Sequence, residues 1–165
     1  MEECDTMKRF ALYSVAVVAA AAFLLTGGRA FGADKDPLVG TWVLDRGKSV
    51  FDPDTELEGR TIIFDAKGGG ISFVQRTVTA AGNTIQSDYV ASYDGKDVPI
   101  SGSQLDTVAL KRIDATKVER TGKMGGKVAE TATMVISNAG KTLTIATKGS
   151  FGGVDYSSTQ VFDKQ

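Results

Sequence analysis

The sequence of 165 residues predicts an all-β fold, a single antiparallel up-and-down β-barrel of about eight to ten strands. From residue 34 to 165, short runs rich in β-branched and aromatic residues are separated by turn signals at about 8–12-residue spacing. Apolar and polar residues alternate within these runs, which is typical of strands with one buried face. No stretch of this region has the period of a helix.

The predicted strands are joined by short connections, several of them rich in glycine. Glycine supplies the positive φ that tight hairpins need, and a parallel crossover needs about a dozen residues or more. Consecutive strands should therefore pair antiparallel. Residues 48–59 form the one longer connection, where Pro53 favours a loop. The ten predicted strands are residues 40–45, 60–66, 71–79, 84–93, 97–101, 107–114, 117–124, 127–137, 142–149 and 154–163.

An open meander of this kind would leave two unpaired edges, and closure into a barrel removes them. The alternation supports a barrel with a buried inner face. Ile62 and Phe64, for example, oppose Thr61 and Asp65. The inner face of each strand is therefore predictable from the parity of its residue numbers.

Residues 1–33 are predicted to be a secretory signal peptide. Lys8 and Arg9 precede an apolar run over residues 10–25, and small residues suited to a signal peptidase follow at 27–33. A retained membrane anchor is the alternative, since a membrane span needs ~20 apolar residues. We expect a secreted or periplasmic protein that contacts a membrane only through this segment, if it is not cleaved.

The predicted barrel domain, residues 34–165, has neither cysteine nor histidine, because the one cysteine is Cys4. Zinc, haem and iron–sulfur sites would lack their usual ligands, so no cofactor and no metal are predicted. The whole chain has 19 Lys plus Arg and 20 Asp plus Glu, a formal net charge of −1. This balance argues against a nucleic-acid partner, which is held by phosphate neutralisation. It does not indicate an oligomeric state.

Three motifs occur in order along the predicted domain. Gly40-Thr41-Trp42 opens the first strand and is followed by Lys48-Ser49, a Tyr-Asp-Gly-Lys turn lies at 93–96, and a charged strand covers 106–114. The pattern resembles a bacterial secreted lipocalin-like domain family of the calycin superfamily, which includes lipocalins and fatty-acid-binding proteins. The resemblance implies a small closed barrel with an internal cavity.

The same resemblance assigns a structural role to the Gly40 and Trp42 motif. Trp42 should pack in the core at the closed end of the barrel. In calycins an arginine commonly stacks over this tryptophan, and Arg112 or Arg76 could take that role here through a cation–π contact.

Strand parity suggests which side chains line a cavity. The candidates combine aromatic and aliphatic side chains with a few polar groups, which is typical of small-molecule pockets. Lone charges inside a dry barrel would be costly, so Arg112, Arg120 and Glu130 should pair, or lie at a wet mouth, or face outward. The candidate ligand-binding residues are Phe73, Tyr89, Tyr93, Leu110, Arg112, Arg120, Met134, Tyr156 and Gln160.

We therefore expect a non-catalytic binding protein that holds a small hydrophobic or amphipathic, mainly apolar ligand in the barrel. The alternative is a barrel whose interior is filled by its own side chains and holds no ligand. A different alternative is an envelope interaction module, an inhibitor or chaperone-like partner, acting through hairpin loops with Phe151 as an exposed anchor. An enzyme is not expected, because the sequence has no Gly-x-Ser-x-Gly motif, phosphate loop, dinucleotide fingerprint or metal-ligand spacing. A carboxylate such as Glu130 or Asp88 near a tyrosine could still do acid–base work without histidine.

Overall fold

The computed structural model describes residues 36–53 and 57–165. The predicted signal peptide lies outside the described residues. Among the described residues, no helix is long and apolar enough to cross a membrane. A 3-10 turn, Asn138–Gly140, joins the eighth strand to the ninth. The strands are β1 (Gly40–Asp52), β2 (Leu57–Lys67), β3 (Gly70–Thr79), β4 (Thr84–Ala91), β5 (Val98–Pro99), β6 (Thr107–Arg112), β7 (Lys117–Met124), β8 (Lys127–Ser137), β9 (Thr142–Phe151) and β10 (Val154–Lys164).

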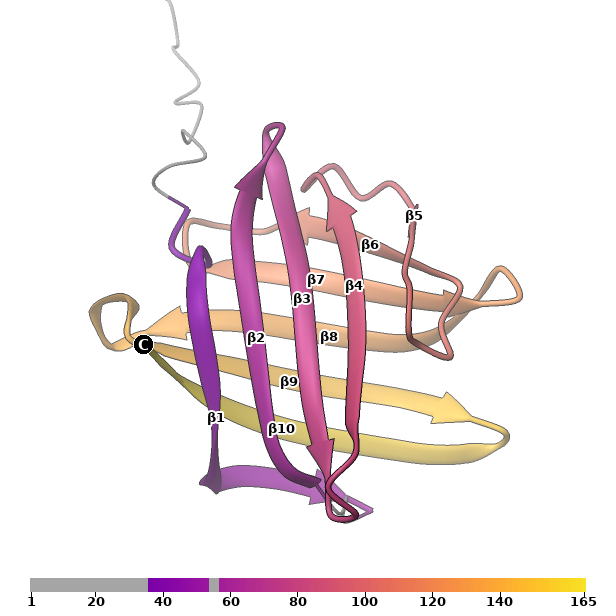
Figure 1. The fold of residues 1–165 in the computed structure, drawn as a ribbon. Helices are drawn as coiled ribbons and strands as arrows, with labels where there is room; N and C mark the ends of the chain where they lie inside the picture. The colour runs from indigo at the N-terminus through magenta and orange to yellow at the C-terminus, as the bar shows by residue number, and fades with distance from the viewer. Residues whose placement is uncertain (1–35, 54–56) are drawn as a thin grey trace, which may run out of the picture. The chain divides into compact units, whose positions relative to one another are not determined.

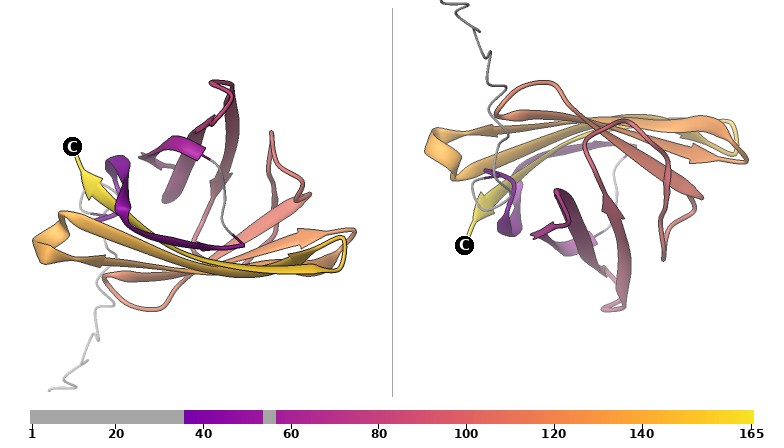
Figure 2. Two further views of the ribbon diagram at one scale, coloured as in Figure 1. Left: turned by 90° about the horizontal axis from the view of Figure 1, so that it is seen from below. Right: turned by 90° about the horizontal axis from the view of Figure 1, so that it is seen from above.

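These strands form one ten-stranded sheet in the order β4-β3-β2-β1-β10-β9-β8-β7-β6-β5. Every paired neighbour is antiparallel, and β1 pairs with β10. In Figure 1, β2–β4 cross in front of β7–β10 at a steep angle. Figure 2 shows these two groups of strands as two curved walls that face each other. The predicted all-β, antiparallel, up-and-down fold is confirmed, with ten strands.

The barrel closes at a narrow seam between β4 and β5. Asp88 and Ser101 form an isolated β-bridge there, with N–H···O distances of 2.9 and 3.2 Å between their backbones. At Gly102, where φ is +63°, a Cβ would lie 1.9 Å from the carbonyl oxygen of Gln86. Only glycine allows the backbone segments at Gln86 and Gly102 to approach this closely. This approach brings the two edges of the sheet together, so the barrel is nearly closed.

The first strand differs from the sequence prediction, which placed a loop at residues 48–59. β1 continues to Asp52 after a register shift between Asp45 and Val50, and it pairs with β2 through its first residues and with β10 along its length. The second half of β1 is strand because the long β10 supplies partners, with Val50 opposite Thr159. The β-strand propensity of residues 48–52 does not by itself indicate this pairing with a strand at the other end of the chain.

The core fills one end of the barrel, which we call the closed end. It lies near the β2–β3, β6–β7 and β8–β9 connections. The opposite end, with the β1–β2, β3–β4, β7–β8 and β9–β10 connections, is the open end. The largest fully buried side chains pack at the closed end: Trp42, Phe64, Phe162, Leu38, Ile62, Ile71, Leu110, Leu143, Val108 and Val118.

Candidate functional site

A cavity of about 580 Å³ lies inside the barrel on the open-end side of the core. The register of the strands places its lining in three levels. The floor, next to the core, is formed by Phe73, Tyr89, Met134 and Ile145. The polar belt above it contains Arg60, Gln75, Arg120, Glu130, Tyr156 and Gln160. The rim at the open end includes Phe51, Ile100, Leu105 and Phe151.

The floor is closed by stacked rings. Phe73 and Tyr89 lie on the paired strands β3 and β4, and their ring centroids are 4.5 Å apart with an interplanar angle of 18°. Phe64 also packs against Phe73, with ring centroids 5.4 Å apart and an interplanar angle of 55°. The Tyr89 hydroxyl is buried and makes no hydrogen bond of good geometry among the described residues, and burial raises the pKa of this phenol to about 12 against the opposing effect of the nearby Arg120. The floor is thus apolar except for one unsatisfied hydroxyl.

One half of the polar belt is an internally neutralised cluster. The Arg120 guanidinium forms an ion pair with the Glu130 carboxylate, and the Tyr156 hydroxyl donates to the other oxygen of Glu130. Burial, followed by the hydrogen bond to Glu130, raises the pKa of Tyr156. The Tyr156 ring crosses Gly149, where a Cβ would lie 2.6 Å from the ring. Glu130 is therefore a paired acid rather than a lone one.

The other half of the belt centres on Arg60 of β2. Its Nε donates to Thr77 Oγ1 at 3.0 Å, and its Nη1 donates to Gln160 Oε1. No carboxylate among the described residues forms an ion pair with it. Burial, and then the nearby charge of Arg120, lower the pKa of Arg60 to about 10. Arg60 is thus a half-buried cation held by neutral acceptors.

Arg60 is not among the predicted ligand-binding residues, although its position in the strand alternation indicates an inward side chain. Arg60 has the same parity as Ile62 and Phe64, which were assigned to the inner face. Their inward orientation on β2 places Arg60 inside the barrel as well.

The structure brings six of the nine predicted ligand-binding residues together around the cavity: Phe73, Tyr89, Arg120, Met134, Tyr156 and Gln160. Tyr93, Leu110 and Arg112 do not line it. Leu110 is fully buried in the core, and Tyr93 and Arg112 lie beyond the core at the closed end. Parity predicts the face of a residue but not its depth along the barrel, which explains the difference. A role in ligand binding stays a prediction for all nine.

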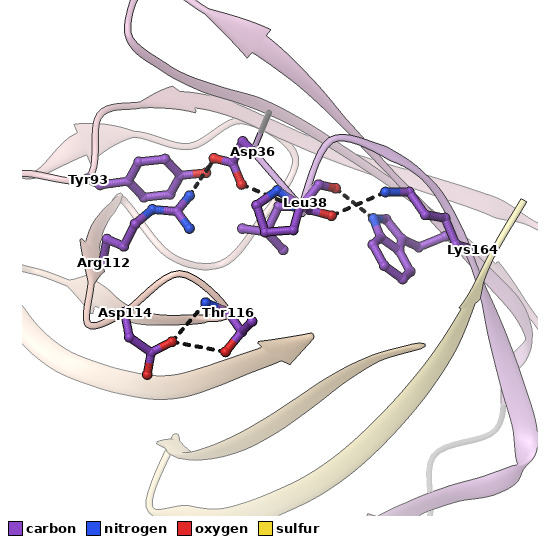
Figure 3. A network of polar contacts seen from close by, with 9 residues as sticks. Asp36, Leu38, Tyr93, Arg112, Asp114, Thr116 and Lys164 are labelled. Carbon is purple, nitrogen blue, oxygen red and sulfur yellow. Dashed lines mark hydrogen bonds and ion pairs between the residues drawn. The ribbon is translucent and has the colours of Figure 1, made fainter. Parts of the chain in front are cut away.

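Tyr93 and Arg112 form a polar cluster with Asp36 at the closed end (Figure 3). The Asp36 carboxylate accepts hydrogen bonds from the Tyr93 hydroxyl, from Arg112 and from the backbone N–H of Leu38, the last at 3.0 Å. The Arg112 guanidinium lies 3.9 Å from the centroid of the Tyr93 ring. This cluster fixes residues 36–38 across the end of the barrel.

The cation over Trp42 is Lys164, so the prediction of Arg112 or Arg76 is wrong. Lys164 Nζ lies 4.9 Å from the Trp42 ring centroid and donates to the carbonyl of Pro37, while the Trp42 indole N–H donates to the carbonyl of Leu38 at 2.8 Å. Lys164 takes this place because β1 and β10 pair Trp42 with Lys164 directly. Arg112 is committed to Asp36, and Arg76 bonds Gln86 on the exposed face.

Phe151 lies at the end of β9 and lines the cavity. It is half-buried, and its ring stacks on Tyr156 with centroids 5.5 Å apart and an interplanar angle of 12°. In this structure it is part of the cavity wall rather than an exposed anchor. No group of three His, Cys, Asp or Glu side chains that could hold a metal ion occurs within residues 36–53 and 57–165.

The fold and the site define a class of protein, a ten-stranded antiparallel barrel with an internal cavity. No family model matches the sequence, and no curated protein matches it. Among solved structures, the chain is similar to zebrafish ileal bile acid-binding protein complexed with cholic acid, at 13% identity and a TM-score of 0.49. The alignment covers 78% of this chain and 99% of that one. At this identity the comparison concerns the fold alone.

Proposed function

We propose that this protein binds a small amphipathic molecule inside its barrel and acts as a non-catalytic binding protein. The cavity of about 580 Å³ is the observation that carries the proposal. Pockets for small ligands usually measure about 300–1,000 Å³ and combine apolar walls with a few polar groups. A barrel filled by its own side chains would leave no such space.

The lining supports an amphipathic ligand rather than a mainly apolar one. The floor and rim offer rings and aliphatic side chains, whereas the belt between them carries two guanidinium groups, a carboxylate and two amides. Buried polar groups favour partners that can hydrogen-bond with them. The bound molecule should therefore combine an apolar body with polar substituents that reach the belt.

Secretion is a second part of the proposal, and it rests on the sequence of residues 1–33. The mass and N-terminal sequence of the protein isolated from its native source would test it. A chain that begins near residue 34 supports export with cleavage, and a chain that keeps the segment contradicts cleavage.

The first prediction tests binding in the cavity with the neutral fluorescent probe N-phenylnaphthylamine. The double variant Ser87→Phe/Ser158→Phe fills the cavity from β4 and β10. Because the probe and the added rings compete for one volume, we expect its affinity to fall by about tenfold or more in a fluorescence titration.

The matched control is Ser72→Phe/Thr144→Phe, which adds the same rings to the outward faces of β3 and β9. It should bind the probe like the wild type. Failure of the wild type to bind the probe, or equal binding by both double variants, would contradict internal binding.

A further inference from the structure

The charges of the polar belt are unevenly matched. Arg120 and Glu130 form an ion pair, so their charges cancel locally. Arg60 adds a second cation to the lining of the cavity and has no ion pair with a described residue. The remaining acid of the lining, Asp52, is exposed at the rim. The interior of the cavity therefore carries an excess of positive charge.

The hydrogen bonds of Arg60 leave much of its guanidinium unused. A guanidinium has five N–H donors. Within the described part of the chain it makes two hydrogen bonds, to the hydroxyl of Thr77 and to the side-chain oxygen of Gln160, and both acceptors are neutral. Carboxylates and similar anions match the fork of donors best and form hydrogen bonds about twice as strong. The Arg60 guanidinium therefore has free N–H donors that suit an anionic acceptor, and the described part of the chain does not supply one.

The location of Arg60 also costs free energy in the ligand-free barrel. Its charge is partly removed from water and lies in the field of Arg120, and both effects disfavour the charged form, while the charge of Glu130 offsets them only in part. A buried charge without a partner is unfavourable unless a counter-charge is present. An anion bound beside Arg60 would supply that counter-charge.

We infer that the ligand is a small amphipathic organic anion and that Arg60 is the residue that binds its anionic group. This inference rests on the proposed function, since it requires a molecule inside the barrel. Gln160 and Thr77 hold the guanidinium in place from β10 and β3. The apolar body of the ligand then lies against the Phe73 and Tyr89 floor or the Phe151 rim.

A structural brace is the competing explanation for Arg60. Its two hydrogen bonds connect β2 to β3 and β10, and such a link could serve stability alone. The two explanations differ in what they predict for charged and neutral ligands. A brace would make binding of both ligands equally sensitive to substitution, whereas an anion-binding residue affects only the charged one.

The test uses two probes with the same ring system, anilinonaphthalenesulfonate, which is an anion, and N-phenylnaphthylamine, which is neutral. Full-length wild type, Arg60→Gln, Arg60→Lys and the control Arg76→Gln are titrated with each probe. Arg76 lies on the exposed face of β3 and bonds Gln86, so its loss removes one positive charge outside the cavity. Circular dichroism and thermal unfolding establish that each variant is folded.

We expect Arg60→Gln to weaken binding of the sulfonate by about tenfold or more, since a charge-assisted hydrogen bond is lost, and to leave the neutral probe within about twofold. Arg60→Lys should restore part of the affinity, and Arg76→Gln should match the wild type. Equal effects on both probes, or no effect on the sulfonate, would overturn the inference while leaving internal binding intact. If the wild type binds neither probe, the proposed function fails, and this inference fails with it.

Discussion

The Tyr89 side chain combines a well-packed ring with a hydroxyl that has no hydrogen-bond partner among the described residues. An unsatisfied buried hydroxyl costs about 1–3 kcal/mol. We expect Tyr89→Phe to keep the stack on Phe73 and to raise the free energy of unfolding by about 1 kcal/mol. Chemical denaturation of the ligand-free protein measures this change.

Tyr93 is the matched control for that prediction. Its hydroxyl donates to the Asp36 carboxylate, so Tyr93→Phe should lower the free energy of unfolding by about 1–2 kcal/mol. A similar loss of stability in both variants would show that the Tyr89 hydroxyl has a partner after all.

Gly40 illustrates how one residue permits the contact that covers Trp42. Its φ is +140°, and a Cβ there would lie 2.5 Å from Lys164 Cε. Gly40→Ala should therefore strain the backbone and displace Lys164, at a cost of about 1–3 kcal/mol in a thermal or chemical unfolding experiment. The control is Gly68→Ala, where φ is +53° and no atom lies within 4 Å of the added Cβ. An equal cost at both positions would mean that the Lys164 contact contributes nothing.

Among the elements, the seam between β4 and β5 is the weakest part of the barrel. Its regular pairing is limited to the bridge between Asp88 and Ser101, whereas β9 is paired along both sides. Local opening requires the least free energy where few hydrogen bonds must break. We expect the amides of Asp88 and Ser101 to exchange with solvent faster than those in the middle of β9, as followed by hydrogen exchange. Equal protection at the two places would contradict a weak seam.

Most elements of the fold were predictable from local patterns. Alternation and glycine-rich turns predicted each of the ten strands and their antiparallel order. The second half of β1 was not predictable, because Gly47 and Pro53 frame a short segment whose strand conformation depends on the distant β10. The cation over Trp42 was missed for the same reason, since the register between the two ends of the chain fixes Lys164 there.

The candidate site was predictable in part. Parity placed Arg120, Tyr156 and Gln160 on the inner face, and all three line the cavity. The pairing of Arg120 with Glu130 depends on a register shift between Gly122 and Lys123, which a bulge creates and local sequence does not reveal. The depth of a side chain along the barrel depends on the register of all ten strands together.

At the scale of the whole barrel, the apolar core and the cavity lie at different ends. The closed end holds the large apolar core, and the Asp36 cluster fixes residues 36–38 across it. The open end carries the polar belt and a cation without an ion-pair partner among the described residues. This division lets the lining of the cavity change without loss of the core, which is how one fold accommodates different ligands.

The most direct test of internal binding is an experimental structure of the full-length protein crystallised with anilinonaphthalenesulfonate. We predict one molecule inside the barrel, with its sulfonate against Arg60 and its rings between the Phe73 floor and the Phe151 rim. Electron density for the probe only on the outer surface, or a barrel interior filled by its own side chains, would contradict the account.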